Sequence, residues 1–198
     1  MPIPDFVYGY RGRSPTKHFT EAQLLAGGQI DPEMGRVDSR SLGFPFLIVK
    51  YKADGGFSVG ENQCMGASAT CVSMINKLND KLWEYDDTQT VSNAVFIFLI
   101  DQYRAILYVS WMGPDGKYYM LPIEDFGFSA GPKGLRDLTS RVQNIFHWAA
   151  RSRLKEIQRA LDTIGEEGRM DSSIDRSEAQ QAGCWRQPDQ TNLDPSIS

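Results

Sequence analysis

Two lysines, two positions apart, have the spacing that most directly suggests chemistry. Lys50 and Lys52 follow the apolar run of residues 44–49, and on an extended chain their side chains point to the same side. Two ammonium groups at the end of a buried strand can hold a phosphate or a carboxylate, so an anion-binding site is the first hypothesis. The structural alternative is that both lysines reach water from the strand end, or form an ion network with Asp5 and Glu61.

Polar residues elsewhere in the sequence are candidates to complete this site. Asp5 lies near the start of the chain, Asp54 follows the second lysine, and Glu61 and Gln63 open the next predicted helix. Glu61 comes three residues after Ser58, which matches a capping box and gives this acid a structural role. Gln63 has no such role, so its side chain should be solvated or directed at the site.

A second group of basic residues lies in a long predicted helix. The group consists of Arg151, Arg153, Lys155 and Arg159. Such a run is typical of a solvated helix face, and basic residues near the end of a helix also suit the negative end of its dipole. If the run lies beside Lys50, Arg151 and Arg153 would join the anion site and guide a phosphate backbone, with Arg11 and Arg13 as further contributors.

Cysteine and histidine offer little material for catalysis. Cys64 and Cys71 share one predicted helix at a separation of roughly 10 Å, beyond the roughly 7 Å that a disulfide allows. Both lie on its apolar face and are predicted to be core thiols. His18 and His147 are the only histidines, and no acid or nucleophile is placed beside either. The sequence therefore predicts no disulfide framework, no structural zinc site and no histidine-activated nucleophile.

The elements that must position these residues follow from hydrophobic periodicity. Strands are predicted over residues 4–10, 46–52, 94–100, 104–111 and 117–123, a loop over 29–43, and helices over 20–26, 58–82 and 133–164, the last with a phase slip near Arg151. This order describes an α/β (α+β) fold, a single domain with a mixed central sheet flanked by helices.

Composition limits the class of protein. The 198 residues have a formal net charge of −4, and residues 1–165 hold equal numbers of acids and bases. Bulk charge therefore does not attach the chain to nucleic acid, although this balance is compatible with a local basic groove. We expect one domain over residues 1–165 and a polar, disordered tail over 166–198. With no signal-peptide pattern and no apolar segment of membrane-spanning length, we expect no membrane contact and an intracellular protein, cytoplasmic or nuclear.

Six motifs occur in a fixed order along the chain. They are Pro4-Asp5, Phe44–Lys52, Glu61–Cys64, Leu107–Trp111, Tyr118–Met120 and Val142–Trp148. Together they resemble an uncharacterised fungal domain family, which is itself similar to the PD-(D/E)XK nuclease fold. The resemblance covers about residues 4–161 and implies a restriction-endonuclease-like domain.

In that nuclease fold, an acid after a proline and a second acid two residues before a lysine bind a divalent cation that activates water. The resemblance implies that Asp5 is the first acid, Lys52 the lysine, and Gln63 or Glu61 a helper. Any Mg²⁺ would be held by Asp5 and Glu61, because magnesium prefers oxygen ligands. The second acid falls at Lys50, so an ammonium stands where the pattern requires a carboxylate.

This departure favours a degenerate metal site. The leading hypothesis is a non-catalytic binding or accessory module without a cofactor, with nucleic acid as its ligand. One alternative is an active Mg-dependent nuclease in which a migrated acid, Glu61 or Asp54, completes the site. Another is a small-molecule enzyme or accessory protein of a fungal biosynthetic pathway, with Lys50 and Lys52 holding an anionic small molecule. The sequence leaves the oligomeric state open.

Overall fold

The computed structural model describes residues 4–11, 18–30, 42–52, 56–85, 87, 89–128 and 131–183, except the side chains of Arg11 and of residues 171–183. In chain order its elements are β1 (Phe6–Arg11), α1 (Glu21–Ile30), β2 (Leu42–Tyr51), α3 (Phe57–Glu84), β3 (Val95–Ile100), β4 (Arg104–Met112), β5 (Tyr118–Gly127), α4 (Pro132–Trp148), the π-helix η1 (Ala149–Arg153) and α5 (Leu154–Gly183). This order confirms the predicted α+β domain.

The described strands form one mixed sheet in the order β1-β2-β3-β4-β5. β1 pairs antiparallel with β2, and β3, β4 and β5 form an antiparallel meander. β2 and β3 run parallel, with Lys50 opposite Leu99, and α3 is the crossover that joins them. Ligands of open α/β sheets bind outside the carboxyl ends of the parallel strands, and the two lysines of the predicted site lie at this edge.

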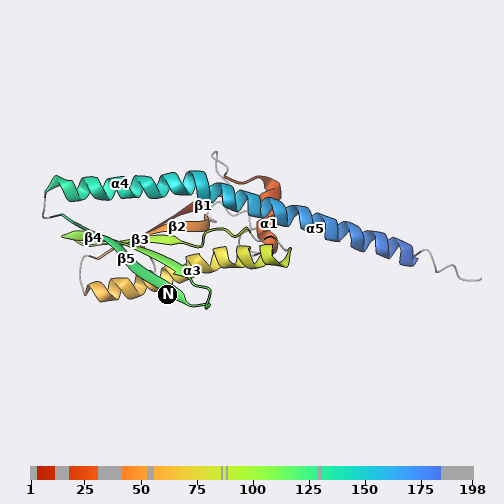
Figure 1. The fold of residues 1–198 in the computed structure, drawn as a ribbon, viewed down its shortest axis with the longest axis horizontal. Helices are drawn as coiled ribbons and strands as arrows, with labels where there is room; N and C mark the ends of the chain where they lie inside the picture. Colours follow the sequence, from red (N-terminus) through yellow and green to blue (C-terminus); the bar gives the residue numbers. More distant parts are fainter. Residues whose placement is uncertain are drawn as a thin grey trace, which may run out of the picture.

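Helices cover both faces of the sheet (Figure 1). α3 lies over one face, whereas α4, η1 and α5 follow one another as a rod over the opposite face. Because side chains alternate along a strand, Ile97 and Leu99 pack in a core cluster with α3 residues such as Val72, and Phe98 packs in the cluster that contains Ile145 of α4. α1 packs against α5.

Small side chains allow α3 to approach the sheet closely. Gly60, Cys64, Ser68 and Cys71 are buried along it, at the three-and-four spacing expected for one helix face. A Cβ atom on Gly60 would lie 2.8 Å from Leu99 Cδ1. Glycine therefore fits where the first turn of α3 crosses the end of β3, and this close approach places the start of the helix beside Leu99 and Lys52.

The long C-terminal helix contains the predicted phase slip. Ala149–Arg153 form a π-helix, which shifts the side chains behind it around the helix axis. Tyr10 anchors this segment, because its hydroxyl donates a hydrogen bond to the Ala149 carbonyl oxygen at 2.7 Å. α5 then continues past Gly165 to Gly183, so the predicted tail begins within a helix; residues 184–198 lie outside the described part.

Several predicted boundaries differ from the structure, and two of them lie in the N-terminal part of the chain. β2 starts at Leu42 rather than Phe46, because the residues before Pro45 pair with the end of β1. α1 runs to Ile30, into the predicted loop over 29–43, of which residues 31–41 lie outside the described part. None of the helices in the described ranges has both the length and the apolar composition needed to cross a membrane.

Candidate functional site

Asp5 and Lys50 are in contact at the carboxyl edge of the parallel strands. Lys50 Nζ lies 3.4 Å from Asp5 Oδ1, and Asp5 Oδ2 accepts a hydrogen bond from Tyr51 N at 2.6 Å. Asp5 N also donates to Val49 O at 3.1 Å, which attaches the segment before β1 to β2. The ion pair expected in the structural interpretation of Lys50 is therefore present, and the ammonium neutralises the carboxylate.

Lys52 lies beside the first turns of α3. A Cβ atom on Gly60 would be 3.2 Å from Lys52 Cγ, and Lys52 N donates to Ile100 O at 2.8 Å. The helix begins at Phe57 after the N-cap Gly56, with no side-chain cap hydrogen bond and no acid in its first turn. Its first backbone N–H groups and its dipole therefore add positive potential close to this lysine.

Glu61 does not form the predicted capping box. Because Gly56 is the N-cap, Ser58 already lies inside the first turn, and Glu61 Oε1 instead accepts a hydrogen bond from the Tyr108 hydroxyl at 2.7 Å. Burial, and then this bond to a carboxylate, raise the pKa of Tyr108, so the phenol keeps its proton and donates. The signal for Tyr108 is the alternation along β4, which turns it to the same side as Ser110.

Cys64 is buried among these charged groups. Burial raises the pKa of Cys64 to about 11, while Lys50 lowers it and Glu61 and Asp5 raise it, so three charged side chains lie within electrostatic range of one thiol. Burial likewise raises the pKa of Cys71 to about 11. Both are free and buried, which confirms the predicted core thiols. Among the described residues no group of three or more His, Cys, Asp or Glu could hold a metal ion.

Gln63, another predicted site residue, has a buried side-chain oxygen. Its Oε1 is buried and has no hydrogen-bond partner in the described part of the chain, and a buried unpaired amide oxygen is unfavourable. The structure thus provides an unsatisfied acceptor on the second turn of α3. Asp54 and Arg13 fall outside the described residues, as does the side chain of Arg11.

Arg104 contributes a cation that the sequence reasoning missed. Its guanidinium carbon lies 4.6 Å from the centre of the Phe57 ring, and its Nη1 pairs with Asp125 Oδ2 at 3.0 Å. Asp101 orders the hairpin that carries it, since Asp101 Oδ1 accepts a hydrogen bond from Arg104 N at 2.8 Å. Because Phe57 is the first residue of α3, Arg104 and Lys52 lie at the same end of that helix.

Arg151 and Arg153 do not join this site, because both belong to η1 on the opposite face of the sheet (Figure 1). Arg151 is exposed, whereas Arg153 is 0% exposed. The predicted solvated basic face is therefore wrong for Arg153, which the π-helix turns inward, and Arg159 pairs with Asp87 at 2.9 Å.

Arg153 has an unusual environment for a charged side chain. Burial lowers the pKa of Arg153 to about 10, so it remains charged at neutral pH. None of its guanidinium nitrogens has a hydrogen-bond partner in the part of the chain that the structure describes. Its guanidinium carbon lies 5.4 Å from the centre of the Trp148 ring, a cation–π contact that replaces only part of the lost hydration.

Comparison with protein families gives a match to most of the chain. A family model described as "Domain of unknown function (DUF7924)" matches residues 1–161. The matched range includes the site around Asp5 and Lys50 as well as η1. No curated protein and no solved structure matches the chain.

Proposed function

This chain belongs to the DUF7924 family, and from the geometry of its site we propose that the domain binds the phosphates of nucleic acid without cleaving them. The observation that carries the proposal is the contact between Lys50 Nζ and Asp5 Oδ1 at 3.4 Å. In the PD-(D/E)XK pattern that the sequence resembles, Asp5 is a metal ligand. Here an ammonium lies against it, which is the arrangement expected of a degenerate nuclease-like site.

The charges argue against a divalent cation at this position. Lys50 in place of an acid changes the local charge by two units, and one unit charge at 4 Å is worth about 4 kcal/mol at an effective dielectric constant of about 20. Both oxygens of Asp5 also have donors, Lys50 Nζ on Oδ1 and Tyr51 N on Oδ2. A metal would have to share these oxygens with their donors and tolerate the nearby ammonium.

The surrounding groups suit a phosphate. Lys52 lies at the start of α3, whose first turn has no acidic residue, and helix N-termini bind anions through their backbone N–H groups and dipole. Arg104 lies over Phe57 at the same helix end. Although Arg104 is paired with Asp125, that pair is half-exposed, and a phosphate can share the remaining guanidinium nitrogens.

Binding of short fluorescent DNA and RNA strands in EDTA at low salt tests the proposal. We expect Lys52→Gln and Arg104→Gln to weaken binding and to reduce the salt slope by about one each, as for phosphate contacts. Lys117→Gln is the control, because Lys117 is exposed in the turn before β5 and pairs only with nearby Asp115 among the described residues. Absence of binding, or an equal loss in the control, would refute the proposal.

Lys50→Glu tests the degenerate site separately, because it recreates the acid two residues before Lys52. We expect Mn²⁺ to raise the melting temperature of Lys50→Glu and to leave the wild type and Lys50→Gln unchanged. Efficient Mg²⁺-dependent cleavage by the wild type, lost in Asp5→Ala and in Lys52→Ala, would favour the active nuclease and overturn our proposal.

A further inference from the structure

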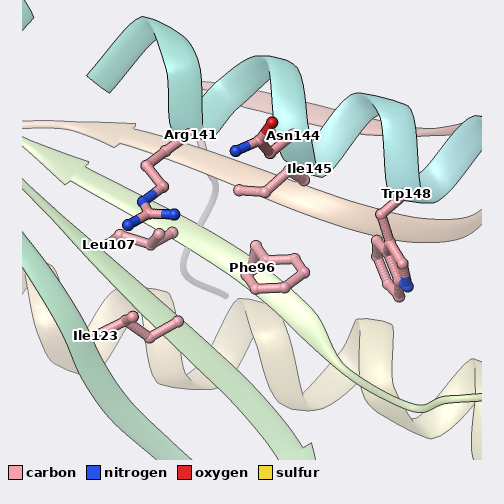
Figure 2. A pocket seen from close by; sticks show the side chains of 7 residues that line it. All are labelled: Phe96, Leu107, Ile123, Arg141, Asn144, Ile145 and Trp148. Carbon is pink, nitrogen blue, oxygen red and sulfur yellow. The ribbon is translucent and has the colours of Figure 1, made fainter. Parts of the chain in front are cut away.

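A pocket of about 330 Å³ lies between α4 and the sheet, on the face opposite the site described above. Phe96 of β3, Leu107 of β4 and Ile123 of β5 form its wall on the sheet side, and Ile145 and Trp148 of α4 form its other apolar wall (Figure 2). The volume is at the lower end of the range for small-molecule sites.

The helix side of the pocket follows a simple pattern in the sequence. The four lining residues of α4 are Arg141, Asn144, Ile145 and Trp148. They occupy positions i, i+3, i+4 and i+7, which lie on one face of an α-helix. Two are apolar and two are polar, so this face presents hydrogen-bonding groups beside an apolar surface.

The apolar walls remain accessible rather than closing into a sealed core. Ile123 is 51% exposed, and Trp148 is half-buried with its ring edge-to-face against Phe96 at 5.4 Å. Leu107, in contrast, is buried at the base. A flat apolar molecule that fills this space would remove exposed aliphatic and aromatic surface from water, which is the main source of affinity in such pockets.

The polar groups of the pocket favour an anion. Arg141 reaches from α4 toward Leu107 (Figure 2). Its Nε donates to Glu124 Oε2 at 2.6 Å, and among the described residues neither of its two terminal nitrogens donates a hydrogen bond. The Asn144 amide is a further polar group of the lining, and no carboxylate is among the described residues that line the pocket.

We propose that this pocket binds a small, flat, largely apolar molecule with one carboxylate, and that the carboxylate accepts hydrogen bonds from the terminal nitrogens of Arg141. Glu124 does not prevent this, because the Arg141–Glu124 pair is solvent-accessible and such pairs contribute little stability. Guanidinium is the side chain best suited to bind a carboxylate through two nitrogens. The apolar walls then orient the remainder of the ligand.

This inference is independent of the proposed nucleic-acid function. The pocket lies on the α4 face and shares no residue with the site at the start of α3. Variants of the pocket are therefore expected to leave nucleic-acid binding unchanged, and either proposal can fail while the other stands.

The test is an NMR titration of the full chain with 2-naphthoate, and with 2-naphthamide as the neutral analogue of the same shape. We expect naphthoate to bind with a Kd of about 1 mM or tighter, and the amide at least tenfold more weakly. Arg141→Met should weaken naphthoate binding about tenfold or more, to the level of the amide. Arg136→Met is the matched control, because Arg136 is exposed on α4 outside this pocket.

A second variant tests the volume rather than the charge. Ile123→Trp, at an exposed position of the edge strand β5, should fill the pocket and abolish naphthoate binding without loss of folding. The proposal is wrong if the wild type does not bind naphthoate at ten times the expected Kd, or if naphthoate and naphthamide bind equally. It is also wrong if Arg136→Met weakens binding as much as Arg141→Met, or if Ile123→Trp binds naphthoate normally.

Discussion

The charged groups beneath α3 differ from one arginine on the opposite face of the sheet, Arg153, in how they are paired. On the face covered by α3, Lys50 pairs with Asp5, and Glu61 accepts a hydrogen bond from Tyr108. On the face covered by α4 and η1, Arg153 is fully buried with no hydrogen-bond partner in the described chain. The site residues that the family resemblance implies lie on the first face. The larger cost in folding free energy lies on the second face, since an unpaired buried charge is strongly destabilising.

Arg153 should give the largest effect on stability. Arg153→Met keeps a long flexible side chain and removes the buried charge, so it should raise the free energy of unfolding by about 1–4 kcal/mol. Urea denaturation followed by circular dichroism measures this change. An increase in the free energy of unfolding would be informative by its sign alone, because most buried substitutions destabilise a protein.

Arg151→Met is the matched control for this prediction. Arg151 belongs to the same π-helix and is exposed, so its replacement should change stability by no more than about 0.5 kcal/mol. If Arg153→Met instead destabilised the protein by about 3–5 kcal/mol, the guanidinium would have to be paired, and the contrast between the two faces would disappear.

The two buried tyrosines should differ by an intermediate amount. Tyr108 donates to the Glu61 carboxylate at 2.7 Å and Tyr10 to the neutral Ala149 carbonyl at the same distance. Since a hydrogen bond to a charged group is stronger, Tyr108→Phe should cost about 1.5–3 kcal/mol and Tyr10→Phe about 0.5–1.5 kcal/mol. Thermal and urea unfolding of both variants check the order, and equal losses would contradict it.

The Asp5–Lys50 pair should give the smallest effect. Their side chains are 39% and 16% exposed, so Lys50→Gln should lower the free energy of unfolding by about 0.2–1 kcal/mol. The loss should shrink in 1 M NaCl, where the Debye length is about 3 Å. A loss above about 2 kcal/mol, unchanged by salt, would mean that the α3 face also depends on a buried charge.

Local patterns in the sequence predict the elements well because periodicity is a local property. The burial of Cys64, Ser68 and Cys71 in α3 follows directly from their spacing. The slip near Arg151 was visible as two apolar stripes out of phase, and it corresponds to η1. The sequence does not show which arginine faces the core, because that depends on where the extra residue lies within one helical turn.

Contacts between distant positions could not be read from such patterns. Thr20 and Gln23 form a reciprocal capping box at the start of α1, whereas Ser58 and Glu61, at the same spacing, do not. Glu61 is instead bonded to Tyr108, which is 47 positions away in the chain. A pattern of residue types identifies the available donors and acceptors, but the tertiary fold decides which of them meet.

The extra residue in η1 also sets the rotational register of the rod. Each residue of an α-helix advances the chain by about 100° around the axis, so deletion of Ala150 would turn α5 by roughly that angle relative to α4. α1 docks on α5 through Gln23, whose amide donates to Asp162 Oδ1 at 3.0 Å. A single residue of length thus decides which side of α5 faces α1, and with it how the N-terminal part of the chain closes onto the C-terminal part.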